Sequence, residues 1–247
     1  MAGFMVCSLV FRASNPTVEQ LFETYQATRD FVPEVVVAVG GGSILDVGKS
    51  LCCLYGTDLP DADSLRRLIE EKSYGHPAAR WIGVPTTAGT GSEVTCWATI
   101  WDPERDAKRS VECRENYAFA ALVDPELAAG MPVTLAVSSA LDAAAHAVES
   151  YWAKGTNAGV PGIGAGSHPH DYGAHGRPAG RNHGAHEAMA RGSMLAGLAF
   201  SDTKTTACHS ISIPDHALRH PPWGGGEYAP WGLCSSSMLS PRPAGTL

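Results

Sequence analysis

The sequence lacks several features that mark whole classes of protein. It has no excess of basic residues, since 18 Lys and Arg against 25 Asp and Glu give a formal net charge of −7. This argues against a nucleic-acid partner, because nucleic-acid binders are usually basic. Its seven cysteines are odd in number and include no CxxC pair, so they do not resemble a disulfide framework. We therefore expect a reducing, cytoplasmic environment, with Cys52 and Cys53 as packing residues.

Targeting and membrane signals are missing as well. The opening stretch, MAGFMVCSLVF, is apolar, but it lacks the basic region of a signal peptide and is too short to span a bilayer. We expect no membrane partner and interpret this stretch as a strand. The 247 residues are enough for one large domain or two modest ones.

The most informative stretch is a run of β-branched residues that ends in three glycines, VAVGGGSILDVGK, Val37 to Lys49. It has neither the GxGxxG spacing nor the GK[ST] of a P-loop. It predicts a buried strand that turns sharply into a helix and directs backbone N–H groups at an anion. Gly40–Gly42 can adopt positive φ and admit a diphosphate, and Ser43 can cap the helix or bind a phosphate oxygen. The alternative is a tight turn without a ligand.

Helical patterns flank this turn on both sides. Asn15 and Pro16 suit an N-cap and a first helical position, and apolar residues then recur at helical spacing. After the turn, Asp46 and Lys49 have the i, i+3 spacing of a helix-surface pair. The order strand, helix, strand, helix predicts a parallel sheet.

A second loop of the same kind follows in WIGVPTTAGTGSEVT, Trp81 to Thr95. Its hydroxyl residues suit the phosphate, ribose or amide of a cofactor; they are Thr86, Thr87, Thr90 and Ser92. The alternative is a polar loop whose hydroxyls cap its own turns. Residues 97–114 suggest a hairpin or an exposed excursion, and residues 120–123 a short strand.

The alanine-rich stretch VTLAVSSALDAAAHAVESYW predicts a helix from Val133 to Trp152 and places a domain boundary near Gly130. On this helix Asp142 and His146 lie one turn apart on the same face. A carboxylate and an imidazole so placed can bind one divalent cation, with other ligands from elsewhere. An ordinary hydrogen-bonded Asp/His pair is the alternative.

Four motifs in order, GGGSILDVGK, PTTAGTGSEVT, VDPELAAGMP and LDAAAHAVESYW, resemble the group III, iron-containing alcohol dehydrogenases. The resemblance covers Asn15 to about Asn157 and returns from about Glu187 to Pro214. It implies an α/β dinucleotide-binding domain (1–130), without the family's first strand-helix unit, and a partial, all-helical metal-binding domain (131–214) of the dehydroquinate synthase-like fold. We expect a truncated and partly disordered version of that fold.

The resemblance also implies roles for individual residues. Asp142, His146 and His209 would ligate a divalent metal, foremost Fe(II), with Zn as the alternative. The metal would act as a Lewis acid on a small aldehyde or alcohol, and the nicotinamide of NAD or NADP would carry hydride. The residues expected to bind that cofactor are Gly41, Gly42, Ser43, Asp46, Thr86, Thr87, Thr90, Lys108 and Leu127. A homodimer is compatible with the family.

Within the family, SYWAKGTN and GLAFSDTKTTACHSIS are most similar to enzymes that reduce phosphonoacetaldehyde in phosphonate antibiotic biosynthesis. Lys154 and Lys204 would then be phosphonate contacts, with plain surface lysines as the alternative. The same motifs leave open an inactive or noncatalytic dinucleotide-binding fragment, a zinc glycerol dehydrogenase-like enzyme and a dehydroquinate synthase-like lyase.

Two stretches depart from the family pattern. Residues 158–186 mix glycine, proline and histidine without a helical or strand period, and residues 215–247 suggest a disordered tail. A histidine-rich metal tract is one interpretation of the first stretch. Codon degeneracy permits family-like sequence if Gly159 to Gly173 and the start of the tail, DHALRHPPWGGG, are read one nucleotide later, so we favour a shifted reading frame. Trp223 stands where the family has a fourth ligand, and we therefore expect weak or absent metal binding.

Overall fold

The computed structural model describes residues 3–157, 183–206 and 209. It divides into two units, the first formed by Met1–Thr86 with Ser92–Val123 and the second by Thr87–Gly91 with the residues from Asp124 onward. The expected boundary near Gly130 thus lies inside the second unit.

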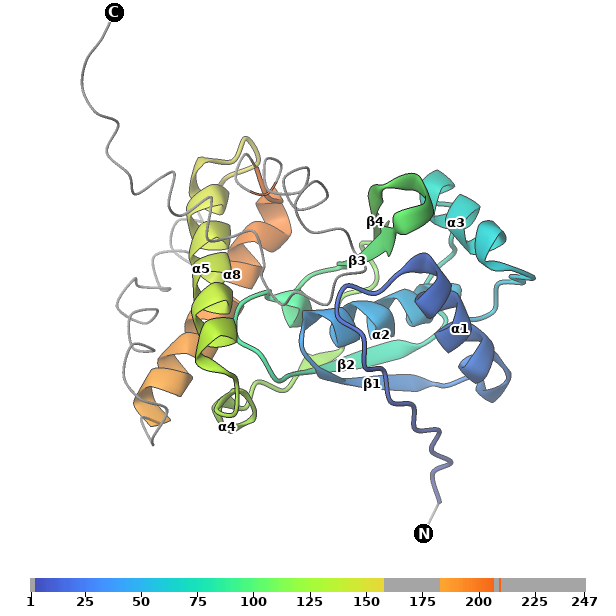
Figure 1. Ribbon diagram of the computed structural model, residues 1–247, viewed down its shortest axis with the longest axis horizontal. Helices are drawn as coiled ribbons and strands as arrows, with labels where there is room; N and C mark the ends of the chain where they lie inside the picture. Colours follow the sequence, from blue (N-terminus) through green and yellow to red (C-terminus); the bar gives the residue numbers. More distant parts are fainter. Residues whose placement is uncertain (1–2, 158–182, 207–208, 210–247) are drawn as a thin grey trace, which may run out of the picture. The chain divides into compact units, whose positions relative to one another are not determined.

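The first unit combines a small parallel sheet with a separate hairpin (Figure 1). The sheet has the order β1 (Val35–Gly40), β2 (Arg80–Pro85) and β5 (Ala120–Ala121), and both strand pairs are parallel, as the strand-helix alternation predicts. The strands β3 (Trp97–Asp102) and β4 (Ala107–Glu112) pair in antiparallel fashion, which confirms the expected hairpin. The elements of the first unit are, in chain order, α1 (Val18–Thr28), η1 (Arg29–Phe31), β1 (Val35–Gly40), α2 (Gly42–Leu54), α3 (Ala62–Glu71), β2 (Arg80–Pro85), η2 (Ser92–Val94), β3 (Trp97–Asp102), η3 (Pro103–Arg105), β4 (Ala107–Glu112) and β5 (Ala120–Ala121).

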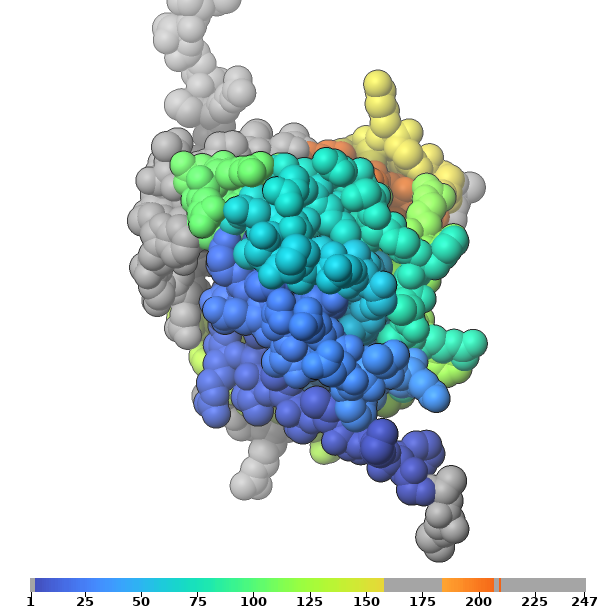
Figure 2. All heavy atoms as spheres, turned by 90° about the vertical axis from the view of Figure 1, so that its right-hand side faces the viewer, coloured from blue at the N-terminus to red at the C-terminus, as the bar shows by residue number. Residues whose placement is uncertain are grey.

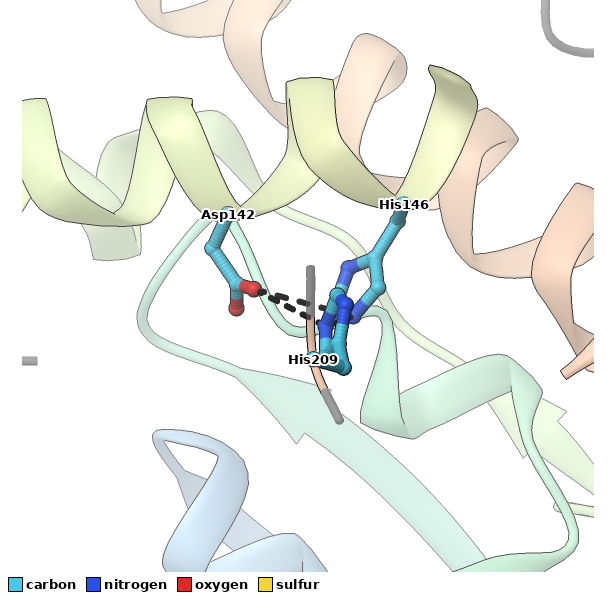
Figure 3. A group of neighbouring side chains, drawn as sticks. All are labelled: Asp142, His146 and His209. Carbon is cyan, nitrogen blue, oxygen red and sulfur yellow. Dashed lines mark hydrogen bonds and ion pairs between the residues drawn. The ribbon is translucent and has the colours of Figure 1, made fainter. Parts of the chain in front are cut away.

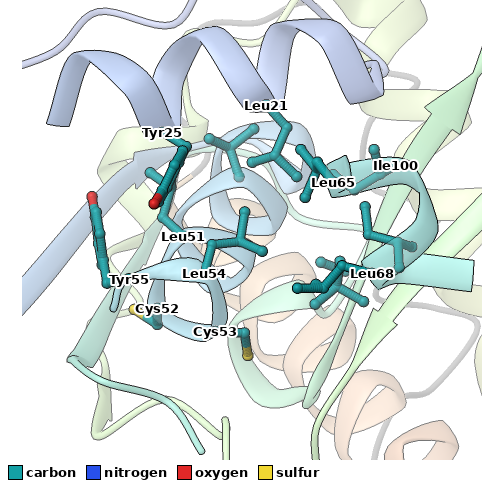
Figure 4. Packing of buried hydrophobic residues seen from close by; sticks show 14 of the residues in the cluster. Leu21, Tyr25, Leu51, Cys52, Cys53, Leu54, Tyr55, Leu65, Leu68 and Ile100 are labelled. Atoms are coloured by element: carbon teal, nitrogen blue, oxygen red, sulfur yellow. The ribbon is translucent and has the colours of Figure 1, made fainter. Parts of the chain in front are cut away.

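The core of this unit lies between α1, α2, α3 and the strands (Figure 4). Helix α2 packs closely on β1, because a Cβ on Gly48 would lie 2.8 Å from Cβ of Ala38. Cys52 and Cys53 are 0% and 1% exposed, which confirms them as packing residues. Burial raises the pKa of the Cys52 thiol to about 12, so this cysteine stays protonated.

The strand that precedes the glycine turn is less buried than expected. β1 is an edge strand, and α2 packs on only one of its faces, the face that carries Ala38. Val35, Val37 and Val39 lie on the opposite face and are 48%, 57% and 53% exposed. The expectation of a fully buried strand is therefore wrong for this face.

The N-terminal segment also differs from expectation. Residues 3–13 form no strand, and Phe4 is 93% exposed; Figure 2 shows this dark blue segment projecting from the packed surface of the first unit. Asn15 adopts a left-handed φ of 54° instead of capping a helix. Thr17 is the N-cap of α1, because its side chain accepts from the backbone N–H of Gln20 while the Gln20 side chain accepts from the N–H of Thr17.

A buried ion cluster joins three elements of the first unit. The Arg66 side chain on α3 is 2% exposed, and its Nε donates to Oδ1 of Asp102, a fully buried residue at the end of β3, over 3.0 Å. Glu19 on α1 and the more exposed Asp63 and Glu104 also pair with this guanidinium. The cluster therefore connects α1, α3 and the hairpin.

The second unit is helical in its described part, with α4 (Pro125–Ala128), α5 (Val133–Trp152) and α8 (His183–Thr203). Helices α5 and α8 lie side by side (Figure 1). The expected helix over 133–152 is confirmed, and it begins after Pro132. The expectation of an irregular stretch as far as residue 186 is wrong at its end, because α8 already begins at His183; residues 158–182 and 210–247 lie outside the described residues. Among the described helices, none has the length and hydropathy needed to cross a membrane.

Candidate metal centre and cofactor-binding turn

Asp142, His146 and His209 converge in the second unit. Asp142 and His146 project from successive turns of α5, and His209 reaches the same point from the segment after α8 (Figure 3). One ligand atom from each residue lies within 4.8 Å of the other two, and all three residues are buried. The two Nε2 atoms are 2.9 Å apart, and each is 3.6 Å from Oδ1 of Asp142.

The donor set of this cluster fits a divalent metal. Oδ1 of Asp142 is buried and makes no hydrogen bond to any described residue, because 3.6 Å is too long for one. A buried carboxylate oxygen in this position is costly unless it is paired or ligates an ion. Two imidazole nitrogens and one carboxylate oxygen match the ligands of Zn²⁺ and of non-haem Fe(II) sites, which keep open positions for other ligands.

Neighbouring groups set the protonation of the two imidazoles. Burial lowers the pKa of His146 to about 4 despite the opposing effect of the Asp142 carboxylate, so His146 is neutral at pH 7. Burial also disfavours charge on His209, but the nearby carboxylates of Asp142 and Glu149 outweigh this effect and raise its pKa. A metal at Nε2 of His209 therefore competes with a proton.

Packing fixes the ring of His146. The Phe200 ring of α8 stacks on it with centroids 4.0 Å apart and an interplanar angle of 10°. The His209 ring stacks on it as well, with centroids 4.6 Å apart. The His146 ring thus lies between Phe200 of α8 and the His209 ring.

The threonine-glycine loop contributes residues 87–91 to this second unit, and close packing explains its two glycines. A Cβ on Gly89 would lie 2.7 Å from Cβ and the backbone oxygen of Ser139 on α5. Gly91 has a φ of 59°, and its Cβ would lie 2.5 Å from Cα of Gly197 on α8. The loop therefore contacts both helices that surround the metal ligands.

Replacing Gly91 with alanine is expected to destabilise the second unit by about 1–3 kcal/mol, the usual cost of overpacking. The added methyl group meets the backbone of α8, which cannot rotate away, and the positive φ disfavours any L side chain. Urea denaturation followed by circular dichroism measures the effect. Gly130→Ala is the control, because a Cβ at Gly130 has nothing within 4 Å; equal stability of the two variants would contradict the packing argument.

The glycine turn of the first unit has the expected place but not the expected conformation. Gly41 is the N-cap of α2 with φ −73° and ψ 179°, and Gly40–Gly42 all lack positive φ. Gly40 instead leaves room for Ile44, whose Cδ1 would lie 2.5 Å from an added Cβ. Because α2 begins at Gly42, its first N–H groups have no intrahelical acceptor, which suits a phosphate.

Ser43 does not cap α2, because no side chain caps this helix. Its Oγ accepts a hydrogen bond of 3.1 Å from the backbone N–H of Asn15. A hydroxyl that accepts one bond can still donate its own proton to a phosphate oxygen. The expected contact between the Ser43 hydroxyl and a phosphate is therefore compatible with this hydrogen bond.

Asp46 and Lys49 form the expected i, i+3 pair, with Nζ and Oδ1 3.4 Å apart, but both are engaged within the first unit. The Asp46 carboxylate accepts from Oγ of Ser92 at 2.6 Å and from the backbone N–H of Thr99 at 2.8 Å. Lys49 is 1% exposed, donates to Thr95 and Trp97, and has a pKa lowered by burial. Asp46 and Ser92 thus join α2 to the segment around β3.

The remaining expected cofactor residues are spread over the chain. The backbone N–H of Thr86 donates to the carbonyl of Gly40 over 2.9 Å, so the ends of β1 and β2 lie together at one edge of the sheet. Lys108 lies in β4 of the first unit, whereas Thr87, Thr90 and Leu127 belong to the second. Within the first unit, the structure therefore brings Thr86 next to the glycine turn. The two lysines considered for a phosphonate, at 154 and 204, are exposed.

Sequence reasoning missed Glu149, the carboxylate that contacts His209. Glu149 is fully buried on α5, three residues after His146 and seven after Asp142. Counted from Asp142 as i, His146 is i+4 and Glu149 is i+7, so all three side chains lie on one face of the helix. This spacing was the signal available in the sequence.

The chain matches a known protein family and several curated proteins. The model of the family described as iron-containing alcohol dehydrogenase matches residues 2–125. Phosphonoacetaldehyde reductase of Streptomyces viridochromogenes is 31% identical over 73% of this chain and 47% of its own length. NADPH-dependent butanol dehydrogenase of Clostridium saccharobutylicum is 28% identical over 85% of this chain and 54% of its own. The chain thus spans about half the length of the curated relatives it matches.

A solved structure shares the fold of the chain. Sulfoacetaldehyde reductase from Bifidobacterium kashiwanohense, in complex with NAD+, superposes with a TM-score of 0.79 and 29% identity over 92% of this chain and 58% of that one. The expected fold class, an α/β dinucleotide-binding domain with a helical metal-binding domain, is confirmed by such neighbours. The parallel sheet with its glycine turn, the cluster of Asp142, His146 and His209 and the family match all agree, and the chain belongs to the iron-containing alcohol dehydrogenases.

Proposed function

We propose that the chain carries the metal-binding and diphosphate-binding parts of a nicotinamide-dependent alcohol dehydrogenase or aldehyde reductase. The observation that carries this proposal is the convergence of Asp142, His146 and His209 in a buried cluster with the donor set of a divalent metal site. When bound, the metal supplies Lewis acidity toward an alcohol or aldehyde oxygen, and the nicotinamide supplies or accepts hydride. We propose Fe(II) as the metal, in agreement with the family's description.

The glycine turn is the proposed diphosphate site. The first N–H groups of α2, at Gly42 and Ser43, would bind the phosphate oxygens, and the Ser43 hydroxyl would donate one further bond. The neighbouring Thr86 supports this site, because its backbone joins the end of β2 to the turn. The cofactor is NAD or NADP. One relative has been solved in complex with NAD+, and the name of another specifies NADPH.

We propose a small aldehyde as the substrate, with phosphonoacetaldehyde as the specific candidate in phosphonate biosynthesis. A phosphonoacetaldehyde reductase is the relative at 31% identity, and sulfoacetaldehyde reductases occur among both the curated relatives and the solved structures. The names of these relatives share a two-carbon aldehyde that carries an anionic group.

Titration of the purified chain with NADH and NADPH, with and without Fe(II) in the absence of oxygen, tests the proposal. We expect saturable cofactor binding, and oxidation of the cofactor by phosphonoacetaldehyde only when Fe(II) is present. The variant Asp142→Asn should keep cofactor binding but lose most Fe(II)-dependent turnover, because it removes a charged ligand from the second unit alone.

The exposed Asp202→Asn on α8 is the control for a lost carboxylate in the same unit and should behave like the wild type. Turnover that persists in Asp142→Asn would contradict the proposed role of the cluster. Cofactor binding without turnover at any Fe(II) concentration would favour the noncatalytic dinucleotide-binding alternative.

A further inference from the structure

Glu149 lies next to the metal-ligand cluster and accepts hydrogen bonds from Thr206 and from the metal ligand His209. Its side chain is fully buried on α5, one turn beyond His146. Oε2 accepts from the backbone N–H of Thr206 at 2.6 Å, and Oε1 accepts from the backbone N–H of His209 at 3.1 Å. The same Oε2 lies 2.9 Å from Nδ1 of the His209 ring.

The chemistry of a carboxylate decides the direction of the ring contact. Each oxygen of Glu149 already accepts a backbone N–H, so the carboxylate acts as an acceptor here, and we assign the proton of the ring contact to Nδ1 of His209. The other ring nitrogen, Nε2, is then the one whose lone pair is available to a metal. Nε2 is also the atom that lies 2.9 Å from Nε2 of His146 and 3.6 Å from Oδ1 of Asp142.

The two backbone contacts add a second constraint. By accepting from the N–H groups of Thr206 and His209, the carboxylate links the main chain at these two residues to α5. The same segment is also held by Trp152, whose Nε1 donates to Oγ1 of Thr206 over 2.9 Å. Glu149 therefore contributes both to the position of the His209 ring and to its orientation.

We propose that Glu149 is a positioning residue for the metal centre, which fixes the Nδ1-protonated form of His209 and aims Nε2 at the ion. The inference rests on the proposed metal-dependent function, because it assigns to Glu149 the support of one ligand. Metal-ligating histidines commonly donate their second ring N–H to a carboxylate, which orients the ring and raises its basicity.

The test compares Glu149→Gln with wild type by Zn²⁺ titration against a competing chelator. Glutamine keeps the size of the side chain but removes the charge and one accepting oxygen. We expect Zn²⁺ affinity to fall by roughly 10-fold, the lower end of the 10- to 100-fold range for such partners. Circular dichroism of the metal-free variant checks that α5 and α8 remain folded. Glu187→Gln, an exposed glutamate on α8, is the matched control and should retain wild-type affinity.

A second readout does not require a variant that folds. Two-bond ¹H–¹⁵N spectra of the wild-type chain should show Nδ1 of His209 protonated without metal and still protonated with Zn²⁺, which then occupies Nε2. Zn²⁺ at Nδ1, or unchanged affinity in a folded Glu149→Gln, would overturn the proposal. If the wild type binds no Zn²⁺, the proposed function fails, while the spectrum of the metal-free protein still tests the Glu149 contact.

Discussion

Replacing His146 with alanine is expected to weaken divalent-metal binding by more than the roughly 10- to 100-fold that loss of an outer-shell partner costs. His146 supplies one of only three ligand atoms found together among the described residues, so its loss leaves a carboxylate and one imidazole. The imidazole is neutral at pH 7, because burial lowers its pKa to about 4, so the metal does not compete with a second proton on this ring. Isothermal titration with Zn²⁺ at pH 7 measures the change.

A matched control separates this effect from general loss of histidine. His76 is an exposed histidine of the first unit that pairs with Glu115, and His76→Ala should bind Zn²⁺ like the wild type. Because His146 packs against Phe200, circular dichroism must show that His146→Ala retains its helices. A folded His146→Ala with wild-type affinity would remove His146 from the metal centre.

Replacing Asp102 with alanine is expected to lower the free energy of unfolding of the first unit by about 3–5 kcal/mol, the usual cost of removing one partner of a buried ion pair. Asp102 is 0% exposed and contacts Arg66, whose side chain is 2% exposed. Without Asp102, the guanidinium keeps partners only at its more exposed side, including Glu104. Urea denaturation followed by tryptophan fluorescence measures the loss.

Glu104→Ala tests the same guanidinium from its exposed side. The Glu104 side chain is 66% exposed and lies 3.1 Å from Arg66, so its removal should cost no more than about 1 kcal/mol. Comparing Asp102→Ala with Glu104→Ala shows whether burial or proximity alone determines how much each ion pair stabilises the first unit. If both variants lose the same stability, the buried pair has no special role in joining α3 to the hairpin.

Local patterns predicted the parts of the structure that depend on neighbouring residues. The i, i+4 spacing placed Asp142 and His146 on one face of α5, and the order of strands and helices predicted the parallel sheet. His209 lies 63 residues beyond His146, and no local period connects them. Its place in the cluster could be anticipated only from the resemblance to the family.

Tertiary packing decided the features that the sequence left open. The hydroxyl residues of the threonine-glycine loop suggested a cofactor site, and the structure adds a packing role for its glycines, because Gly89 and Gly91 let the loop approach Ser139 and Gly197. Asp46 suggested a cofactor contact, yet its carboxylate bonds to groups brought close by the fold. Glycine and aspartate serve packing and binding equally well, so residue type alone does not distinguish the two uses.

X-ray absorption spectroscopy of the Zn²⁺-loaded chain tests most directly whether Asp142, His146 and His209 share one ion. The account predicts only nitrogen and oxygen ligands at about 2.0–2.2 Å, with outer-shell scattering from two imidazoles. In Asp142→Asn and His146→Ala the ion should be lost or its ligand shell altered. Sulfur ligands at about 2.3 Å, or an unchanged spectrum in both variants, would contradict the shared site.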